Sequence, residues 1–294
     1  MASLLAANAV AGNGKQLSAE DAYDRLHSIE RQTFSQPESL RHQAIEDEYN
    51  KFFGREHFEK TPRDHIADEG LEYYFRAAHM AFFYGLKPGF SARLHAIGDE
   101  MEKRGRIDNQ QRGVLYESMI RTRRFDDARQ YLDKHPGLNV APPPTVEARP
   151  SAKLALYSVE AGSRLKEIEA PLDGQPTLVV VSHPQCAFSR AAMEAAAKDP
   201  LVSQSLGRVL WITPQDGNLY LKEILAWNQA HPATQVFVTK FKSDWPMFDE
   251  RATPSFYLLV DGVVKKHFSG WPRDDGNMRK LREISETLRQ ETSR

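Results

Sequence analysis

The sequence has little cysteine, little charge imbalance and no long apolar run. Of its 294 residues only one is a cysteine, so no disulfide can form within one chain and no multi-cysteine metal site can be built. The 39 lysine and arginine residues are balanced by 40 aspartate and glutamate residues, which leaves a net charge of −1. A surface without a basic excess is not typical of proteins that bind nucleic acid or an anionic membrane. No run of about 18 apolar residues occurs, and we therefore expect no transmembrane segment.

What remains is the composition of an ordinary globular protein, with 40% hydrophobic and 27% charged residues. The length exceeds one average domain, so we expect two domains behind a flexible tail or remnant signal peptide at residues 1–16. Residues 1–11 are small and apolar, and positions 7–9 and 9–11 fit the small-x-small pattern of a signal-peptide cleavage site. This pattern favours a periplasmic or otherwise exported protein. A cytoplasmic protein with a disordered N-terminal tail is the alternative.

Residues 17–138 are predicted to form an all-helical domain. Ser18 is placed to cap the first helix, with Asp21 three residues further on. Apolar residues then recur at helical spacing in two segments, which predicts one buried face in each. These positions are Leu71, Tyr74, Phe75, Ala78 and Phe82 in the first segment and Phe90, Leu94, Ile97 and Met101 in the second. Pro88 and Gly89 mark the predicted turn between them, and the aromatic residues between 73 and 84 are interpreted as core.

The end of this region carries a further pattern. A Leu-Tyr pair at 115–116 is followed by the sequence Arg-Phe-Asp-Asp-Ala at 124–128, in which a basic, an aromatic and two acidic residues precede alanine, and by a proline at 136. This order resembles a tetratricopeptide-type helical hairpin over about 25 residues, without a clean second copy. An ordinary helical bundle is the alternative and the favoured interpretation. Residues 139–150 are rich in proline and are predicted to be a semi-rigid linker between the domains.

Residues 151–294 show strand patterns that alternate with helical ones. The predicted strands are 154–159, 177–181, 209–212, 235–238, 256–260 and 263–268, and the predicted helices are 188–198, 219–230 and 281–288. Asp261 and Gly262 are suited to turn a hairpin between the last two strands. Strands interleaved with helices and closed by a hairpin and a helix predict an α/β domain.

One strand in this region leads into a distinctive turn. After the apolar run 177–181 come Pro184, Gln185 and Cys186, with Ser189 three residues after the cysteine and Arg190 next to it. This order resembles the active-site turn of the thioredoxin-like superfamily, where a strand runs into Pro-Trp-Cys-x-x-Cys and a basic residue. Gln185 here replaces the aromatic residue, and Ser189 replaces the second cysteine.

A second part of the resemblance lies downstream. Thr253 and Pro254 match the threonine and cis-proline that face the active-site cysteine in this superfamily, and Gly262 and Gly270 follow at equal spacing. Together with the cysteine turn, they identify residues 151–294 as a thioredoxin-like domain. The resemblance implies a central mixed sheet with flanking helices, preceded by the all-α domain, and a substrate backbone bound at Thr253 and Pro254.

The chemistry of this turn predicts a single-cysteine mechanism. A cysteine at a helix N-terminus has its thiolate stabilised by backbone N–H groups and the helix dipole. The Ser189 hydroxyl can donate a hydrogen bond to that thiolate, but it cannot attack a mixed disulfide, so the dithiol cycle is excluded. We expect a thiol–disulfide oxidoreductase or isomerase. Its predicted site residues are Cys186, Ser189 and His183 for catalysis and Thr253, Pro254, Pro184 and Gln185 for substrate binding.

Two other functions stay open. The first is a redox-inactive binding module or chaperone-like adaptor that holds a partner at the cis-proline groove with help from the helical domain. The second, a metal carrier using His183 and Cys186, is disfavoured because two ligands do not fill a metal site. We predict no metal and no cofactor beyond glutathione or another external thiol. The expected partners are a protein or small-molecule disulfide or thiol, an external reductant or oxidant, and a second copy or partner protein at the helical domain.

Overall fold

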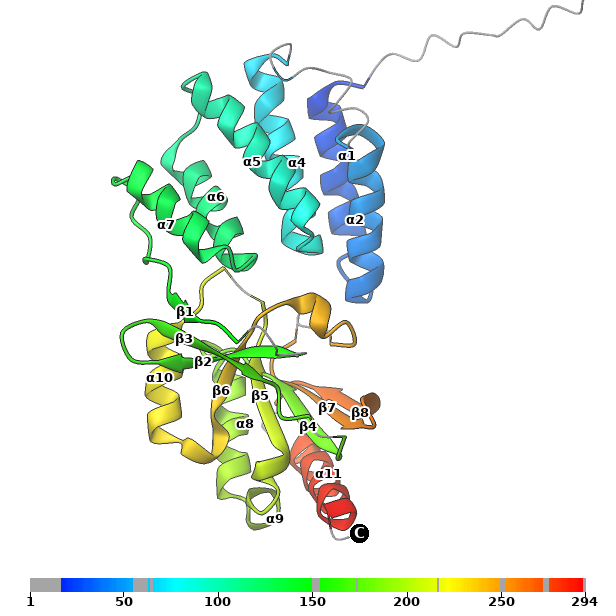
Figure 1. Ribbon diagram of the computed structural model, residues 1–294. Coiled ribbons are helices and arrows are strands. Elements are labelled where there is room, and N and C mark those ends of the chain that lie inside the picture. Colours follow the sequence, from blue (N-terminus) through cyan, green and yellow to red (C-terminus); the bar gives the residue numbers. More distant parts are fainter. Residues whose placement is uncertain are drawn as a thin grey trace, which may run out of the picture.

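The structure is a computed structural model that describes residues 17–54, 63, 66–149, 154–172, 174–215, 217–248, 252–271 and 275–292. Its N-terminal region consists of helices and stands on the end of a sheet region, as Figure 1 shows. The helices are α1 (Ala19–Gln32), α2 (Glu38–Phe52), α4 (Asp68–Gly85), α5 (Pro88–Lys103), α6 (Asn109–Arg121) and α7 (Phe125–Lys134). The predicted tail at residues 1–16 lies outside the described residues.

Local signals in the sequence account for several of these helices. Ser18 caps α1 as predicted, because its side chain accepts a hydrogen bond from the Asp21 amide at 3.0 Å. The predicted buried faces of α4 and α5 are confirmed at every position. The turn lies just before the predicted position at Pro88 and Gly89, because Pro88 is already the first residue of α5. Leu86, at a left-handed φ of 49°, is the C-cap of α4. Proline suits the first helical position because it has no N–H to leave unpaired there.

The aromatic segment of α4 is not all core, which corrects part of the prediction. Tyr74, Phe75 and Phe82 are buried, but the side chain of Phe83 is 47% exposed. Tyr84 lies at the same end of α4 and hydrogen-bonds through its hydroxyl to the Glu30 carboxylate at 2.6 Å. The end of α4 nearest the sheet region is therefore a polar and aromatic surface.

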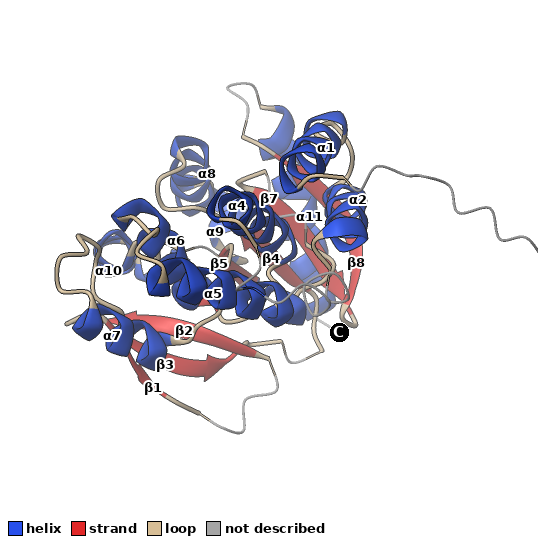
Figure 2. Cartoon of the chain, turned by 90° about the horizontal axis from the view of Figure 1, so that it is seen from above, coloured by secondary structure: helices blue, strands red, loops and turns tan. Residues whose placement is uncertain are grey.

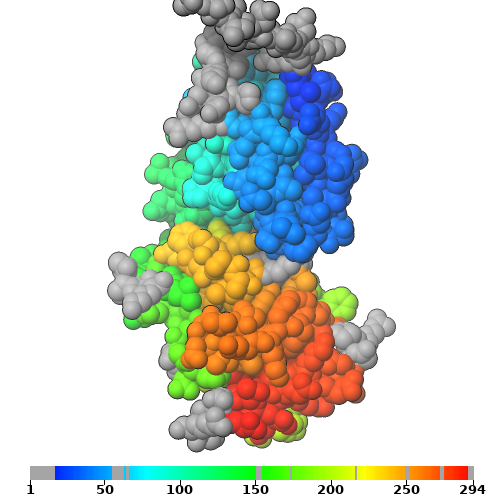
Figure 3. Space-filling model, turned by 90° about the vertical axis from the view of Figure 1, so that its right-hand side faces the viewer, coloured from blue at the N-terminus to red at the C-terminus, as the bar shows by residue number. Residues whose placement is uncertain are grey.

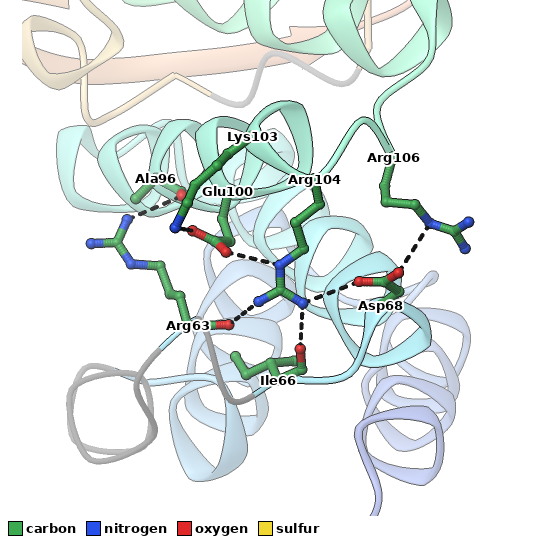
Figure 4. Close-up of polar contacts among 8 residues, drawn as sticks. All are labelled: Arg63, Ile66, Asp68, Ala96, Glu100, Lys103, Arg104 and Arg106. Atoms are coloured by element: carbon green, nitrogen blue, oxygen red, sulfur yellow. Dashed lines mark hydrogen bonds and ion pairs between the residues drawn. The ribbon is translucent and has the colours of Figure 1, made fainter.

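At the opposite end of this helical region, Arg104 forms hydrogen bonds that connect separate segments of the chain (Figure 4). Its guanidinium donates to the Glu100 carboxylate at 2.8 Å and to the Asp68 carboxylate at 3.1 Å. It also donates to the backbone carbonyls of Ile66 and Arg63. A single planar group thus joins the end of α5 to the start of α4 and the segment before it.

The predicted linker segment packs against its neighbours on both sides. Tyr116 of α6 donates from its hydroxyl to the Ala141 carbonyl at 2.6 Å, and Arg129 of α7 donates to the Pro144 carbonyl at 3.1 Å. The segment also contains a short strand, β1 (Thr145–Glu147), which pairs in parallel with β3 (Arg164–Glu169). The predicted division into 17–138, 139–150 and 151–294 stays a prediction.

The sheet has eight strands in the order β1-β3-β2-β6-β5-β4-β7-β8. The remaining strands are β2 (Ala155–Glu160), β4 (Thr177–Val181), β5 (Val209–Thr213), β6 (Val236–Thr239), β7 (Ser255–Val260) and β8 (Val263–Ser269). Strands β4, β5 and β6 run parallel, whereas β7 runs antiparallel to β4 and β8 antiparallel to β7. The β7–β8 hairpin turns at Asp261 and Gly262, both at positive φ, as the sequence predicted.

The two faces of this sheet are covered differently. On one face pack α8 (Ala187–Lys198), α10 (Leu221–Ala230) and α11 (Gly276–Thr292), which share a core with alternate residues of β4 and β7. On the other face Trp245 and Phe248 pack against Val179, Ile212 and Tyr257. Short helices α9 (Pro200–Ser203), η2 (Leu206–Arg208), η3 (Pro232–Thr234) and η4 (Lys242–Asp244) complete the described elements. The expected fold class is confirmed: a helical region precedes a mixed sheet with flanking helices in a thioredoxin-like arrangement.

The helical region packs on the sheet region through apolar residues of α6 and α7, since Phe125 and Ala128 share one hydrophobic core with Tyr157 of β2. Polar contacts at turns add to this packing, and Figures 2 and 3 show the helices stacked over the strands. Arg123, in the turn between α6 and α7, is buried and donates to the Thr239 carbonyl at the end of β6 at 2.8 Å. Lys242 of η4 contacts the Glu38 carboxylate at the start of α2. No helix within the described part of the chain combines the length and apolar character needed to cross a bilayer.

Candidate functional site

Cys186 lies where the central strand β4 gives way to helix α8. All five residues of β4 are buried, so the strand is fixed between β5 and β7 and its end has a defined position. The Cys186 amide donates to the His183 carbonyl at 2.9 Å, which closes the turn, and the Cys186 carbonyl accepts the first helical bond from Arg190 at 3.1 Å. Cys186 is therefore the N-cap residue of α8. The first amides of a helix have no partner within it and present positive charge at this position.

The segment before β7 faces this cysteine. Strands β4 and β7 pair so that Val181 lies opposite Ser255, which brings the ends of the two segments together. The Thr253–Pro254 peptide bond is cis. The Cys186 thiol donates to the Thr253 carbonyl with a sulfur–oxygen distance of 3.2 Å. The cysteine and the threonine–proline pair thus meet although they are far apart in the sequence.

The surroundings of the sulfur lower its pKa. Burial acts to raise the pKa of the Cys186 thiol because it disfavours the charged form. Hydrogen bonds from the backbone amide of Ser189, the side chain of Thr253, the hydroxyl of Ser189 and the amide of Phe188 act in the opposite direction and outweigh burial. The net pKa lies below the ordinary value of a thiol, so a larger share of Cys186 is thiolate at neutral pH.

Ser189 occupies the position of a second cysteine. Its side chain is fully buried, and its hydroxyl oxygen accepts a hydrogen bond from the His183 amide at 3.3 Å. The same hydroxyl is one of the groups that lower the pKa of Cys186. The geometry is consistent with the predicted hydrogen bond to a thiolate, and a hydroxyl in this place has no sulfur chemistry of its own.

The other predicted residues form the turn around the cysteine. The His183 ring accepts a hydrogen bond at Nδ1 from the Gln185 amide at 3.1 Å and meets the Tyr220 ring edge-on at 5.0 Å. Gln185 is exposed, and the Pro184 carbonyl accepts a hydrogen bond from Arg190 at 2.8 Å. The structure therefore brings Cys186, Ser189 and Thr253 together, while His183 is held by its own turn. A tuning role for His183 stays a prediction.

Two hollows flank this turn. One, of about 410 Å³, lies between the cysteine turn and α10, and its lining includes Met193, Ile224 and Trp227 as well as Arg190 and Glu223. The second, of about 350 Å³, lies between the helical region and the threonine–proline segment. We call it the Thr253 cleft; its lining includes Arg41, Tyr84, Arg121, His183, Lys242 and Thr253.

The sequence did not point to the cationic residues of the Thr253 cleft. Arg41, Arg121 and Lys242 belong to three separate segments, and none of them forms a motif with Cys186. They are neighbours only because the helical region packs on the sheet region. A signal for them would have required knowledge of that packing.

Metal ligands are not grouped in the part of the chain that the structure describes. No three histidine, cysteine, aspartate or glutamate side chains gather there in a way that would hold a metal ion. The metal-carrier hypothesis, with His183 and Cys186 as ligands, gains no third ligand from these residues.

Comparison with known proteins gives distant likenesses only. No protein-family model matches the chain, and no curated protein matches its sequence. A secreted disulfide oxidoreductase of Mycobacterium tuberculosis is similar over 45% of this chain and 94% of its own, with 12% identity and a TM-score of 0.34. A thioredoxin-like protein from Bacteroides caccae is similar over 92% of this chain and 93% of its own, with 13% identity and a TM-score of 0.30. Likeness at this level says nothing about the activity of this chain.

Proposed function

We propose that this protein carries out thiol–disulfide exchange through the single thiol of Cys186. The observation that carries the proposal is the position of that thiol, at the N-cap of α8 and 3.2 Å from the Thr253 carbonyl, with a lowered pKa. A thiolate is the nucleophile in disulfide exchange, and a helix N-terminus beside hydroxyl donors favours it near neutral pH. Cys186 is also partly exposed, so a substrate sulfur has access to it.

The reaction has two balanced steps. The Cys186 thiolate attacks one sulfur of a substrate disulfide; a bond forms between the two sulfurs, and the other half of the substrate leaves as a thiolate. Ser189 cannot release the resulting mixed disulfide because it has no sulfur. An external thiolate, from glutathione or another thiol, attacks the substrate sulfur and restores the Cys186 thiolate. One half of the substrate has then left as a thiolate, the other half leaves as a mixed disulfide with the external thiol, and Cys186 returns to its starting state.

The residues around Cys186 have distinct proposed roles. Thr253 and Pro254 bind the substrate backbone at the entrance to β7, and Ser189 stabilises the thiolate. Pro184 and Gln185 form the rim against which the substrate rests. His183 positions this rim through the hydrogen bond that its ring accepts from the Gln185 amide.

The proposal extends to where and with whom the protein acts. We place it in the periplasm or another exported location, on the small-x-small pattern of residues 1–11. Compartment decides whether exchange reduces or isomerises disulfides, because it sets the redox state of the external thiol. The helical region selects the partner or joins a second copy of the chain.

A second candidate function rests on one observation. Phe188, next but one after Cys186, is 57% exposed on the first turn of α8. A large apolar side chain that is exposed two residues after the cysteine suits non-covalent binding of a partner and needs no sulfur chemistry. In this alternative the fold serves as a redox-inactive binding module or adaptor.

Trapping separates the two candidates. An exchange protein without a resolving thiol accumulates mixed disulfides in the cell, and these vanish in reducing buffer and in a Cys186→Ser variant. We expect mass spectrometry of acid-quenched cells to find Cys186 bonded to partner cysteines or to a small thiol. Partners that co-purify equally with the Cys186→Ser variant, with no sulfur adduct on the wild-type chain, would establish the binding module instead. A Phe188→Ala variant should weaken that non-covalent association and leave the adducts in place.

A further inference from the structure

The Thr253 cleft carries more positive than negative charge. Among its described lining residues Arg41, Arg121 and Lys242 are basic, and Glu38 is the carboxylate. Glu38 contacts both Lys242 and His42, which also lines the cleft. The carboxylates of Glu30 and Glu117, which pair with the two arginines, are not among the lining residues. A ligand in the cleft therefore meets a cationic wall.

The two arginines retain donor capacity. The Arg41 side chain is 7% exposed, and its Nη2 donates to the Glu30 carboxylate and, at 2.7 Å, to the Tyr84 hydroxyl. Its Nε is buried and makes no hydrogen bond. The Nε of Arg121 is also buried without a hydrogen bond, at 3.7 Å from the Glu117 carboxylate. Buried donors without partners are uncommon in folded proteins, and these two Nε atoms leave each guanidinium with hydrogen-bonding capacity that the described side chains do not use.

Shape and position connect this wall to the thiol. Thr253 and His183 line the cleft, and the Thr253 carbonyl lies 3.2 Å from the Cys186 sulfur. Figure 3 shows the segment around η4, in gold, beside the lower end of the blue helices, and Lys242 of η4 contacts Glu38 at the start of α2. A volume of about 350 Å³ is at the small end of the range for small-molecule pockets. A ligand that occupies it lies against Thr253, whose carbonyl is hydrogen-bonded to the Cys186 thiol, and against the cations.

We propose that the Thr253 cleft binds a low-molecular-weight disulfide that carries carboxylate groups, with Arg121 and Lys242 as its carboxylate contacts. This inference rests on the proposed exchange function and names its substrate class. The Cys186 thiolate attacks the sulfur nearest to it, one half of the disulfide leaves as a carboxylate-bearing thiolate, and the other half stays bonded to Cys186. Arg41, held by Glu30 and Tyr84, keeps the wall in place and contributes its charge. The helical region thus completes the substrate site of the sheet region.

The test compares three symmetrical disulfides that differ in charge. The full chain is mixed with 3,3′-dithiodipropionate, bis(2-hydroxyethyl) disulfide or cystamine, and adduct formation on Cys186 is followed by mass spectrometry. Each rate is divided by the rate of the same disulfide with a small reference thiol, which removes differences in leaving-group reactivity. We expect the anionic disulfide to exceed the cationic one by at least about tenfold at low salt, with a smaller ratio at high salt.

Variants assign the preference to the cleft. Arg121→Gln and Lys242→Gln should each lower the anionic preference by about tenfold, whereas Lys242→Arg should retain it. Lys198→Gln removes a charge from the far end of α8 and should leave the preference unchanged. Alkylation by uncharged iodoacetamide should be the same in all four variants, which shows that the fold and the thiolate are intact.

The outcomes separate this inference from the function on which it rests. Equal normalised rates for the three disulfides would overturn the carboxylate site and leave exchange at Cys186 standing. A preference that survives both glutamine variants would also overturn the assignment to this cleft. Failure of all three disulfides to form an adduct would overturn both proposals.

Discussion

Restoring a second thiol next to Cys186 should convert the proposed single-cysteine chemistry into a dithiol cycle. Ser189 lies on the first turn of α8, three residues after Cys186, and a helix with a rise of 1.5 Å per residue and a radius of about 2.3 Å places Cα atoms at this spacing about 5 Å apart. That separation is within reach of a disulfide, whose Cα atoms are usually about 4.4–6.8 Å apart. Ser189 is also fully buried beside the sulfur. The Ser189→Cys variant therefore places a thiol where it can attack a mixed disulfide on Cys186.

The magnitude follows from effective concentration. Well-oriented groups within one molecule behave as if present at about 1 M or far above it, whereas an external thiol is supplied at about 1 mM. The mixed disulfide should therefore disappear on the order of a thousandfold faster in Ser189→Cys than in the wild-type chain. The wild-type chain, with one cysteine, should release one equivalent of thionitrobenzoate from Ellman's reagent and keep a stable adduct.

The variant should release two equivalents and end as an internal disulfide, detected as a loss of two hydrogens by mass spectrometry. Ser285→Cys is the matched control, because Ser285 is equally buried but lies on α11. It should not remove the adduct from Cys186. A stable adduct on Cys186 in the Ser189→Cys variant would refute the placement of residue 189 beside the sulfur.

Two further predictions concern the stability of the fold, the first at the contact between the two regions and the second within the sheet region. Arg123→Met removes the buried donor to the Thr239 carbonyl and should lower the free energy of unfolding by about 2–3 kcal/mol in urea titrations. Arg124→Met removes a half-exposed ion pair with Asp127 and should lower it by less than about 1 kcal/mol. Equal losses would contradict this account. Burial acts to raise the pKa of Asp199, but hydrogen bonds from two backbone amides and from Arg282 hold the pKa below its ordinary value. The ionised carboxylate therefore stabilises the fold above about pH 4, and this stabilisation is lost as the pH falls further. Asp199→Asn should therefore cost about 1–2 kcal/mol at neutral pH and less below pH 4; a cost that is independent of pH would contradict the assignment.

The parts of the site that were predicted are those that local sequence determines. Cys186 and Ser189 share one helical turn, and Thr253 and Pro254 directly precede β7, whose first five residues are buried. Each segment carries a local sequence pattern, and the resemblance to the thioredoxin-like superfamily implied that the two would meet. The thioredoxin-like architecture followed from the same features.

The parts that were missed depend on packing between distant segments. Strand β3 was not predicted because four of its six residues are charged and one of them, Glu167, stands at a buried position. That glutamate is accommodated by Lys240 at 2.9 Å, a partner from another strand end. The Thr253 cleft was missed for the same reason, since Glu38 and Lys242 are 204 residues apart. Contacts of this kind leave no pattern in either segment alone.

The central claim is that Cys186 is a reactive thiolate, and the pH dependence of its alkylation tests this most directly. Since the chain has one cysteine, the rate of reaction with iodoacetamide reports this residue alone. We predict a rate that reaches half of its maximum below the pKa of an unperturbed thiol, about 8.5, and a shift to higher pH in Ser189→Ala, which removes one hydrogen bond to the sulfur. A midpoint at or above that of a free thiol, or no reaction in the folded protein, would contradict the account.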